Sequence, residues 1–327
     1  MVRLIVDDLG SFSRIEPTID ISSGSQEVNG ITVIGWEQAD DIEPAALVIE
    51  AFAVNLPMSY VAAMAAKVPP PIWINLEHLS GESWVGEHHL LPSPHAELPL
   101  TKHFFFPGFV PNTGGLIRER HLLAERDAFT TVNDANQLRI FLFSYANAAG
   151  DNLIRAMRES DRPVRCTVPA GAFAANLQRG SALAGEPPQN FAIETFPFVA
   201  QRTFDNVLWS HDVLFVRGED SFVRAQWAAK PFVWQIYPQR ENAHWVKLNA
   251  FLLLYCDGLE KDAASVLREL WRVWNAEDCA EVATAWRRFI GHLPALQAHA
   301  KAWSKKLAQM PDLAANLLSF YQKNVKI

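Results

Sequence analysis

The polar turn Arg217-Gly218-Glu219-Asp220-Ser221 contains the residue types of this chain that are best suited to chemistry. It follows the apolar, β-branched run 213–216. The segment after it, 222–230, has the spacing of a helix that ends at Pro231. In open α/β sheets, ligands bind at such turns, where a strand ends and a helix begins. We therefore expect a ligand site at this turn.

The chemistry expected of the turn is anion binding. With Ser221 or Asp220 as the helix cap, backbone N–H groups of the first turn stay free to donate to an anion such as a diphosphate. Arg217 adds a planar cation beside them. The carboxylates of Glu219 and Asp220 would repel a diphosphate, so hydroxyl groups or a cationic acceptor suit them better. A capped helix with a surface ion pair is the alternative, and these residues alone leave both readings open.

The rest of the sequence predicts two α/β regions, because short apolar runs alternate with helical segments. In the first region we expect strands at 3–6, 31–34, 46–50 and 72–76, a helix at 58–66, and loops throughout 78–121. In the second we expect strands at 138–143, 164–168, 191–196, 213–216 and 232–236, a helix at 148–158, and a polar loop at 180–190. From residue 242 onward the pattern is helical, and Trp271 and Trp274 have the spacing of core residues.

Composition excludes several classes of protein. A length of 327 residues favours two domains, and a net charge of −7 argues against general nucleic-acid binding. No apolar run is long enough to span a membrane, and the N-terminus lacks a signal-peptide layout. Cys166, Cys256 and Cys279 lie far apart, which predicts neither disulfides nor zinc and favours the cytoplasm. We expect the loop histidines at 88, 89 and 95 to be solvated rather than metal-binding.

Distinctive stretches of sequence indicate a family. The longest runs from Phe215 to Gln239, and shorter ones lie at 6–9, 48–53, 73–77, 91–95, 98–102, 104–109 and 113–116. In these stretches, and over nearly the whole chain, the sequence resembles the EarP family of protein-arginine rhamnosyltransferases, which modify elongation factor P. The resemblance implies a GT-B fold, with two Rossmann-like domains facing a cleft. It also implies inverting transfer of rhamnose from dTDP-β-L-rhamnose to an arginine of elongation factor P, by a monomer that needs no metal or other cofactor.

The resemblance also implies the roles of individual residues. Glu219 matches a residue assigned to catalysis, Phe198 and Gln201 match positions that hold the thymine base, and Tyr145 and Tyr237 match residues lining the sugar diphosphate. The implied donor site therefore consists of Tyr145, Phe198, Gln201, Arg217, Gly218, Glu219, Asp220, Ser221 and Tyr237. Without the resemblance, these aromatic residues would be read as core. The stretches 75–77 and 92–115 of the first region are expected to face the acceptor protein.

One departure from the family pattern concerns the N-terminus. The family begins with an additional strand, a glycine-bearing loop and a helix, a unit on the order of 30 residues. That loop supplies an aspartate regarded as the general base, whereas here Met1 falls just before the strand that should come second. We expect this first β–α unit to be missing, either because the start is misplaced or because the protein lacks its base. The alternative function is then a non-catalytic protein that binds the nucleotide or elongation factor P.

Domain boundaries follow from the same pattern. We expect an N-terminal, acceptor-side domain at 1–130 and a nucleotide-sugar-binding domain at 131–305, because the polar stretch near 125–136 separates the two α/β regions. A final helical segment, 306–327, is expected to pack back onto the first domain.

Overall fold

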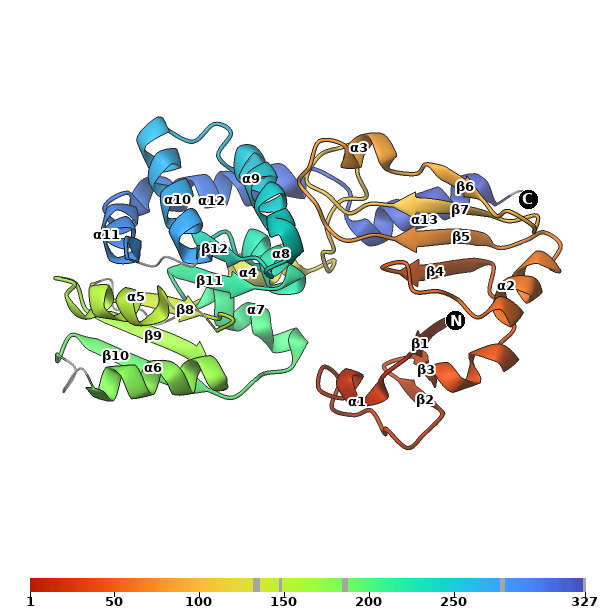
Figure 1. Cartoon of the computed structure of the whole chain (residues 1–327), viewed down its shortest axis with the longest axis horizontal. Helices are drawn as coiled ribbons and strands as arrows, with labels where there is room; N and C mark the ends of the chain where they lie inside the picture. The colour runs from red at the N-terminus through yellow and green to blue at the C-terminus, as the bar shows by residue number, and fades with distance from the viewer. Residues whose placement is uncertain (132–135, 147–148, 184–187, 277–279, 326–327) are drawn as a thin grey trace. The chain divides into compact units, whose positions relative to one another are not determined.

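The computed structural model describes residues 1–131, 136–146, 149–183, 188–276 and 280–325. The chain forms two compact units (Figure 1): unit 1 comprises Met1–Leu116 and Asp312–Ile327, and unit 2 comprises Ile117–Pro311. The sequence placed the boundary at residue 130, but helix α4 (Leu122–Ala128) packs against unit 2, where Arg126 Nη1 donates to the carbonyl of Trp227 at 2.9 Å. The polar stretch near 125–136 indicates a surface segment, but polarity alone does not show to which unit such a segment belongs.

Unit 2 is built around a five-stranded sheet with the order β10-β9-β8-β11-β12, and every neighbouring pair is parallel. All five predicted strands are confirmed: β8 (Leu138–Leu142), β9 (Val164–Pro169), β10 (Phe191–Phe196), β11 (Val213–Arg217) and β12 (Phe232–Gln235). The central strands β8 and β11 are buried on both faces, which explains their almost continuous apolar sequence. The chain passes outward from β8 to β10 and then returns to β11, so the order of strands reverses between β8 and β11.

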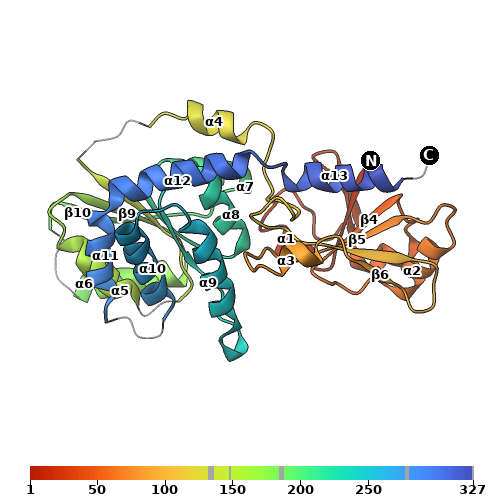
Figure 2. The same ribbon diagram turned by 90° about the horizontal axis from the view of Figure 1, so that it is seen from above.

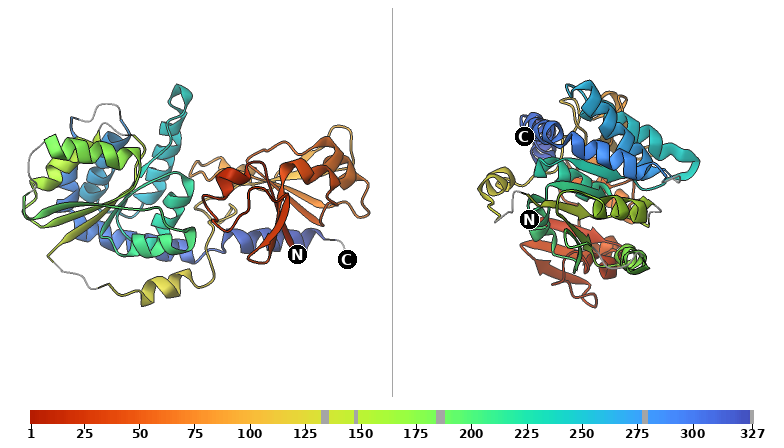
Figure 3. Two further views of the ribbon diagram at one scale, coloured as in Figure 1. Left: turned by 90° about the horizontal axis from the view of Figure 1, so that it is seen from below. Right: turned by 90° about the vertical axis from the view of Figure 1, so that its left-hand side faces the viewer.

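Helices cover both faces of this sheet, as right-handed crossovers require. Those after β8 and β9, α5 (Ala149–Arg158) and α6 (Ala172–Leu183), lie on one face. Those after β10 and β11, α7 (Gln201–Trp209) and α8 (Glu219–Ala228), pack on each other, and α12 packs on α8 (Figure 3). The predicted helical end is confirmed as η2 (Arg240–Asn242), α9 (Ala243–Tyr255), α10 (Lys261–Asn275), α11 (Val282–Gly291) and α12 (Leu293–Ala308).

The structure of unit 2 differs from the sequence prediction at helix α6. The polar segment 180–190 was predicted to be a loop, but α6 continues to Leu183, so the first residues of that segment are helical. Residues 184–187 of that segment, and Ala148 of the predicted helix 148–158, lie outside the described residues. Trp271 and Trp274 are buried as predicted, with Trp271 Nε1 donating to the carbonyl of Phe232 at 2.8 Å.

Unit 1 contains a four-stranded sheet with the order β4-β5-β7-β6 and a three-stranded sheet with the order β1-β3-β2. The strands are β1 (Val2–Val6), β2 (Ser25–Val28), β3 (Ile31–Gly35), β4 (Leu47–Ala51), β5 (Ile72–Leu76), β6 (Pro92–Pro94) and β7 (Thr101–Phe105). The short helical elements α1 (Leu9–Phe12) and η1 (Trp36–Asp41) flank the smaller sheet. Parallel pairing of β4 with β5 and of β5 with β7 confirms the predicted α/β class for this unit as well.

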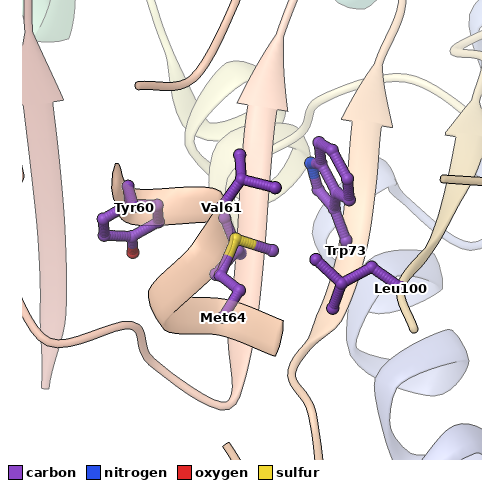
Figure 4. Packing of buried hydrophobic residues seen from close by; sticks show 6 residues of the cluster. Tyr60, Val61, Met64, Trp73 and Leu100 are labelled. Atoms are coloured by element: carbon purple, nitrogen blue, oxygen red, sulfur yellow. The ribbon is translucent and has the colours of Figure 1, made fainter. Parts of the chain in front are cut away.

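The larger sheet of unit 1 is covered on both faces. Figure 4 shows Val61 and Met64 of α2 (Met58–Ala65) facing Trp73 of β5. Ile74, the next residue of β5, points to the opposite face, where it packs with Leu313 of the C-terminal helix α13 (Leu313–Asn324). Figure 2 shows α13 running along these strands.

The prediction that residues 78–121 form only loops is wrong. This segment contains α3 (Val85–His88) and the strands β6 and β7. The prolines at 92 and 94 argued against a strand at β6, but prolines are tolerated there because β6 is an edge strand. Consecutive phenylalanines at 104–106 hid the alternation of β7. Within the part of the chain that the structure describes, no helix has the length and apolarity needed to cross a membrane.

Candidate functional site

The turn at 217–221 lies at the carboxyl end of β11, beside the point where the strand order reverses. Helix α8 starts at Glu219, earlier than predicted, and its N-cap is Gly218 with φ 68° and ψ 177°, a conformation that essentially only glycine adopts. The prediction that Ser221 or Asp220 caps the helix is wrong, because both lie in its first turn. Gly218 has no side chain with which to cap α8, so the N–H groups of that turn remain suited to an anion.

Arg217 presents its guanidinium over two aromatic rings. Its central carbon lies 4.2 Å from the ring centre of Phe143 and 4.5 Å from that of Tyr145. These contacts fix the plane of the cation. Its Nε is buried and has no hydrogen-bond partner among the described residues. A buried donor without a partner is costly, and an anionic ligand would satisfy it.

A cavity of about 230 Å³ opens where β8, β9 and β11 end. Three of the predicted site residues, Tyr145, Phe198 and Arg217, line it. The other lining residues come from the end of β8 and the turn after it, and from the end of β9, the following turn and the start of α6: Leu142, Phe143, Ser144, Ala146, Val168, Pro169, Ala170, Gly171, Ala172 and Phe173. Ligands of doubly wound sheets bind in this position, at the switch point of the strand order.

The remaining predicted residues join this group through direct contacts. Tyr237 packs edge-on against Tyr145 with 5.5 Å between ring centres, and Phe198 packs in the same way against Phe143 at 6.1 Å. Phe198 is 66% exposed and Tyr237 65%, so the alternative reading of these two aromatic residues as core is wrong.

Gln201, the first residue of α7, donates from Nε2 to Asp220 Oδ2 at 2.5 Å. The predicted residues come from four separate segments of unit 2, near residues 145, 198–201, 217–221 and 237, and together they form one constellation. Ser221 is buried and Glu219 is half-buried.

Strand β12 contributes two residues that sequence analysis missed. Gln235 is buried, and its Oε1 accepts from Ser144 Oγ at 2.6 Å and from the backbone N–H of Tyr145 at 2.7 Å. The indole of Trp234 donates to the carbonyl of Gly218 at 3.0 Å. These two neighbours therefore hold the Tyr145 turn and the Gly218 turn. A glutamine at the end of an otherwise apolar strand was the signal that could have revealed the first of them.

Replacing Gln235 by methionine, which has a similar volume, is expected to raise the dissociation constant for thymidine diphosphate about three- to tenfold, because the N–H of Tyr145 loses its acceptor and a lost hydrogen bond costs about 1 kcal/mol. Titration calorimetry measures this change. Gln309→Met, at the exposed C-cap of α12, is the matched control and should bind as the parent does. Parental affinity in Gln235→Met would show that the Tyr145 turn needs no support from β12.

The histidines and cysteines that the structure describes form no comparable site. Among the described residues, no group of three or more His, Cys, Asp or Glu side chains is arranged to hold a metal ion. Cys166 and Cys256 are buried free thiols, whereas Cys279 lies outside the described residues. The prediction of a solvated His89 is wrong, because burial lowers its pKa to about 4 and its Nδ1 accepts from the N–H of Phe106 at 3.1 Å.

In unit 1, the stretch 75–77 lies at the carboxyl end of β5. Asn75 is fully buried, donates to Glu77 Oε1 at 2.5 Å, and accepts from the N–H of Ala53 at 3.0 Å. Asn75 is therefore held in place by the turn after β4.

Comparisons with known proteins agree with the sequence-based resemblance. The profile of a family described as "Elongation-Factor P (EF-P) rhamnosyltransferase EarP" matches residues 1–322. A protein-arginine rhamnosyltransferase from Pseudomonas putida is 44% identical over 99% of this chain and 91% of its own length. One from Pseudomonas aeruginosa is 39% identical over 98% of this chain and 90% of its own length.

A solved structure, described as "Structural basis for EarP-mediated arginine glycosylation of translation elongation factor EF-P", is 38% identical and has a TM-score of 0.59. The match covers 68% of this chain and 76% of the other. The predicted fold class, α/β of the GT-B type, is confirmed, and the chain is a glycosyltransferase that modifies protein arginine. The chain belongs to the EarP family of elongation factor P rhamnosyltransferases.

Proposed function

We propose that this chain transfers L-rhamnose from dTDP-β-L-rhamnose to an arginine of elongation factor P, with inversion at the anomeric carbon. The observation that carries the donor half is the constellation around Arg217. A half-buried guanidinium over two rings, a helix N-terminus without a side-chain cap, and a cavity lie together at the switch point of the sheet. The acceptor half rests on relatives that are named for arginine modification or for elongation factor P.

Each part of the donor has matching chemistry in unit 2. The exposed ring of Phe198 and the amide of Gln201 suit a planar base with hydrogen-bonding edges. Arg217 and the first N–H groups of α8 suit the diphosphate, whose negative charge grows as the bond to the anomeric carbon breaks. The hydroxyl of Tyr237 can add a further donor, and we propose that these groups meet the leaving-group charge without a metal ion.

The acceptor poses the harder chemical problem. An arginine guanidinium stays protonated at neutral pH and its lone pairs are delocalised, so it is a poor nucleophile. A carboxylate cannot deprotonate it beforehand, but it can orient one nitrogen, oppose the charge, and receive a proton as the C–N bond forms. We propose this role for Glu219. The buried thiols of Cys166 and Cys256 support a reducing, cytoplasmic location, and we propose that the enzyme acts as a monomer.

Intact-mass spectrometry of elongation factor P tests the proposal. Incubation with this protein and dTDP-β-L-rhamnose should add the mass of one deoxyhexose, and replacing the target arginine of the acceptor by lysine should prevent the addition. Binding of both substrates without any mass change would support the non-catalytic alternative instead. Consumption of the donor without modification of the acceptor would indicate a different reaction.

A further inference from the structure

Arg224 is buried at the centre of an ionic cluster in unit 2. It is one turn of α8 beyond Asp220 and only 5% exposed. Its Nη1 and Nη2 donate to the two carboxylate oxygens of Glu119 at 2.6 and 2.5 Å, and Nη1 also donates to Asp205 Oδ2 at 3.1 Å. Its Nε lies 3.8 Å from Asp220 Oδ1. One guanidinium therefore faces three carboxylates that come from three different segments of the chain.

Two of the three carboxylates, Asp205 and Asp220, belong to the helices that begin at the candidate donor site. Asp205 lies on α7, the helix that begins with Gln201, and Asp220 accepts the hydrogen bond from Gln201. Arg224 therefore holds together the two helices that supply this pair. If the two helices shifted relative to one another, Gln201 and Asp220 would separate.

Glu119 belongs to the segment 117–121, by which the chain enters unit 2 after Leu116. Helix α8 holds this segment at a second point, where the indole of Trp227 donates to the carbonyl of Ile117 at 2.9 Å. The guanidinium of Arg118 also lies over the Trp227 ring, 5.2 Å from its centre. The helix that begins at the candidate donor site is thus fixed, farther along, to the first residues of unit 2.

Electrostatics couples the members of this cluster. Hydrogen bonds from Arg224 lower the pKa of Glu119. Burial raises the pKa of Asp205 to about 6; the positive charge of Arg224 opposes this increase, and the negative charges of Glu119 and Asp220 add to it. Burial alone would lower the pKa of Arg224, but its carboxylate partners raise it. A change of charge at Glu119 therefore alters the attraction between Arg224 and Asp220, because both carboxylates interact with the same guanidinium.

We propose that Arg224 is a positioning residue for the sugar-nucleotide donor: by pairing with Glu119 and Asp205, it holds Asp220 against Gln201. Donor affinity then depends on Glu119, a residue that is not part of the donor site. This inference rests on the proposed function, because it takes Gln201 and Asp220 as donor-binding residues.

The test uses Glu119→Gln, because replacing the buried Arg224 would leave Asp205 unpaired and could unfold unit 2. With Glu119 neutral, the guanidinium is attracted more strongly to Asp220 and draws it away from Gln201. We expect the dissociation constant for thymidine diphosphate to rise about five- to tenfold, a typical coupling for residues in one ionic network. The KM for elongation factor P should stay within about twofold of the parental value, because changes at uncoupled sites affect one another by no more than about this factor.

A double-mutant cycle distinguishes positioning from a general structural effect. In an Asp220→Asn background, Glu119→Gln should have almost no further effect on thymidine diphosphate binding, because the residue through which it acts has lost its charge. The matched control is Glu269→Gln, which neutralises a carboxylate paired with Arg288 on α11 and should bind as the parent does.

Each outcome decides the proposal. Parental affinity in Glu119→Gln, or an equal loss in both backgrounds, would overturn the positioning role while leaving the donor site in place. Parental affinity in Asp220→Asn alone would remove Asp220 from the donor site, and with it the premise of this inference. A loss in Glu119→Gln that disappears in the double variant would support it.

Discussion

Arg217→Ala is expected to abolish measurable binding of thymidine diphosphate while unit 2 remains folded. The side chain lies over Phe143 and Tyr145 at the edge of the sheet, and its Nε has no partner among the described residues, so its removal opens no hole in the core. Loss of one preorganised donor to a developing anion costs about 3–4 kcal/mol of transition-state stabilisation, a factor of about several hundred in kcat/KM. Titration calorimetry and initial rates measure the two effects.

Two further variants sharpen this prediction. Arg165→Ala removes an arginine that pairs with Glu194 on the surface of neighbouring strands, and it should leave binding and rate unchanged. Arg217→Lys keeps the charge but loses the planar contact with the rings, so it should recover only part of the affinity. An Arg217→Ala protein that binds the nucleotide as tightly as the parent would contradict the placement of the diphosphate at this turn.

The sequence predicts the central architecture of unit 2 because strong local signals coincide there. The run 213–216 is apolar and β-branched, and it is buried on both faces as such runs usually are. The polar turn that follows can only lie at the end of that strand. The start of α8 was misplaced because serine and aspartate are the commoner capping residues, whereas here a glycine at positive φ begins the helix.

The supporting residues could not be predicted, because their partners are distant in sequence. Gln235 pairs with Tyr145 across 90 positions, and Arg224 pairs with Glu119 across 105. The sequence does not show whether an arginine is buried or solvated, and only the fold shows which carboxylates it contacts. Strand β7 was not predicted, because a run of three phenylalanines shows no alternation of apolar and polar residues. It is nevertheless an inner strand of the four-stranded sheet of unit 1.

The fold explains why the residues of the candidate donor site are spread over several segments of the chain. Parallel strands bring their carboxyl ends to one edge, so the turns after β8, β9, β11 and β12 all meet there, although far apart in the chain. Aromatic residues come from the turns after β8, β10 and β12, and the cation comes from the end of β11. In the proposed function, recognition of a base, a diphosphate and a sugar is thereby divided among several elements of one sheet.

Glu219→Gln is expected to lower kcat by about 10² to 10³ while leaving the dissociation constant for thymidine diphosphate nearly unchanged. The amide keeps the shape of the side chain, and α8 still begins at Gly218, so the N–H groups that suit the diphosphate stay in place. What is lost is the negative charge that, in our proposal, faces the acceptor guanidinium as the C–N bond forms. Single-turnover rates with excess enzyme, measured by the mass of elongation factor P, separate this step from product release.

The comparison with Asp220→Asn makes the roles of the two neighbouring carboxylates distinguishable. Asp220 accepts from Gln201 and should act on donor affinity, whereas Glu219 should act on the rate of transfer once both substrates are bound. Suppose that Glu219→Gln weakened nucleotide binding as strongly as Asp220→Asn, and that the variant enzyme transferred rhamnose at the parental rate with both substrates saturating. Glu219 would then be a donor-binding residue only. The charge that opposes the guanidinium would then have to come from another carboxylate.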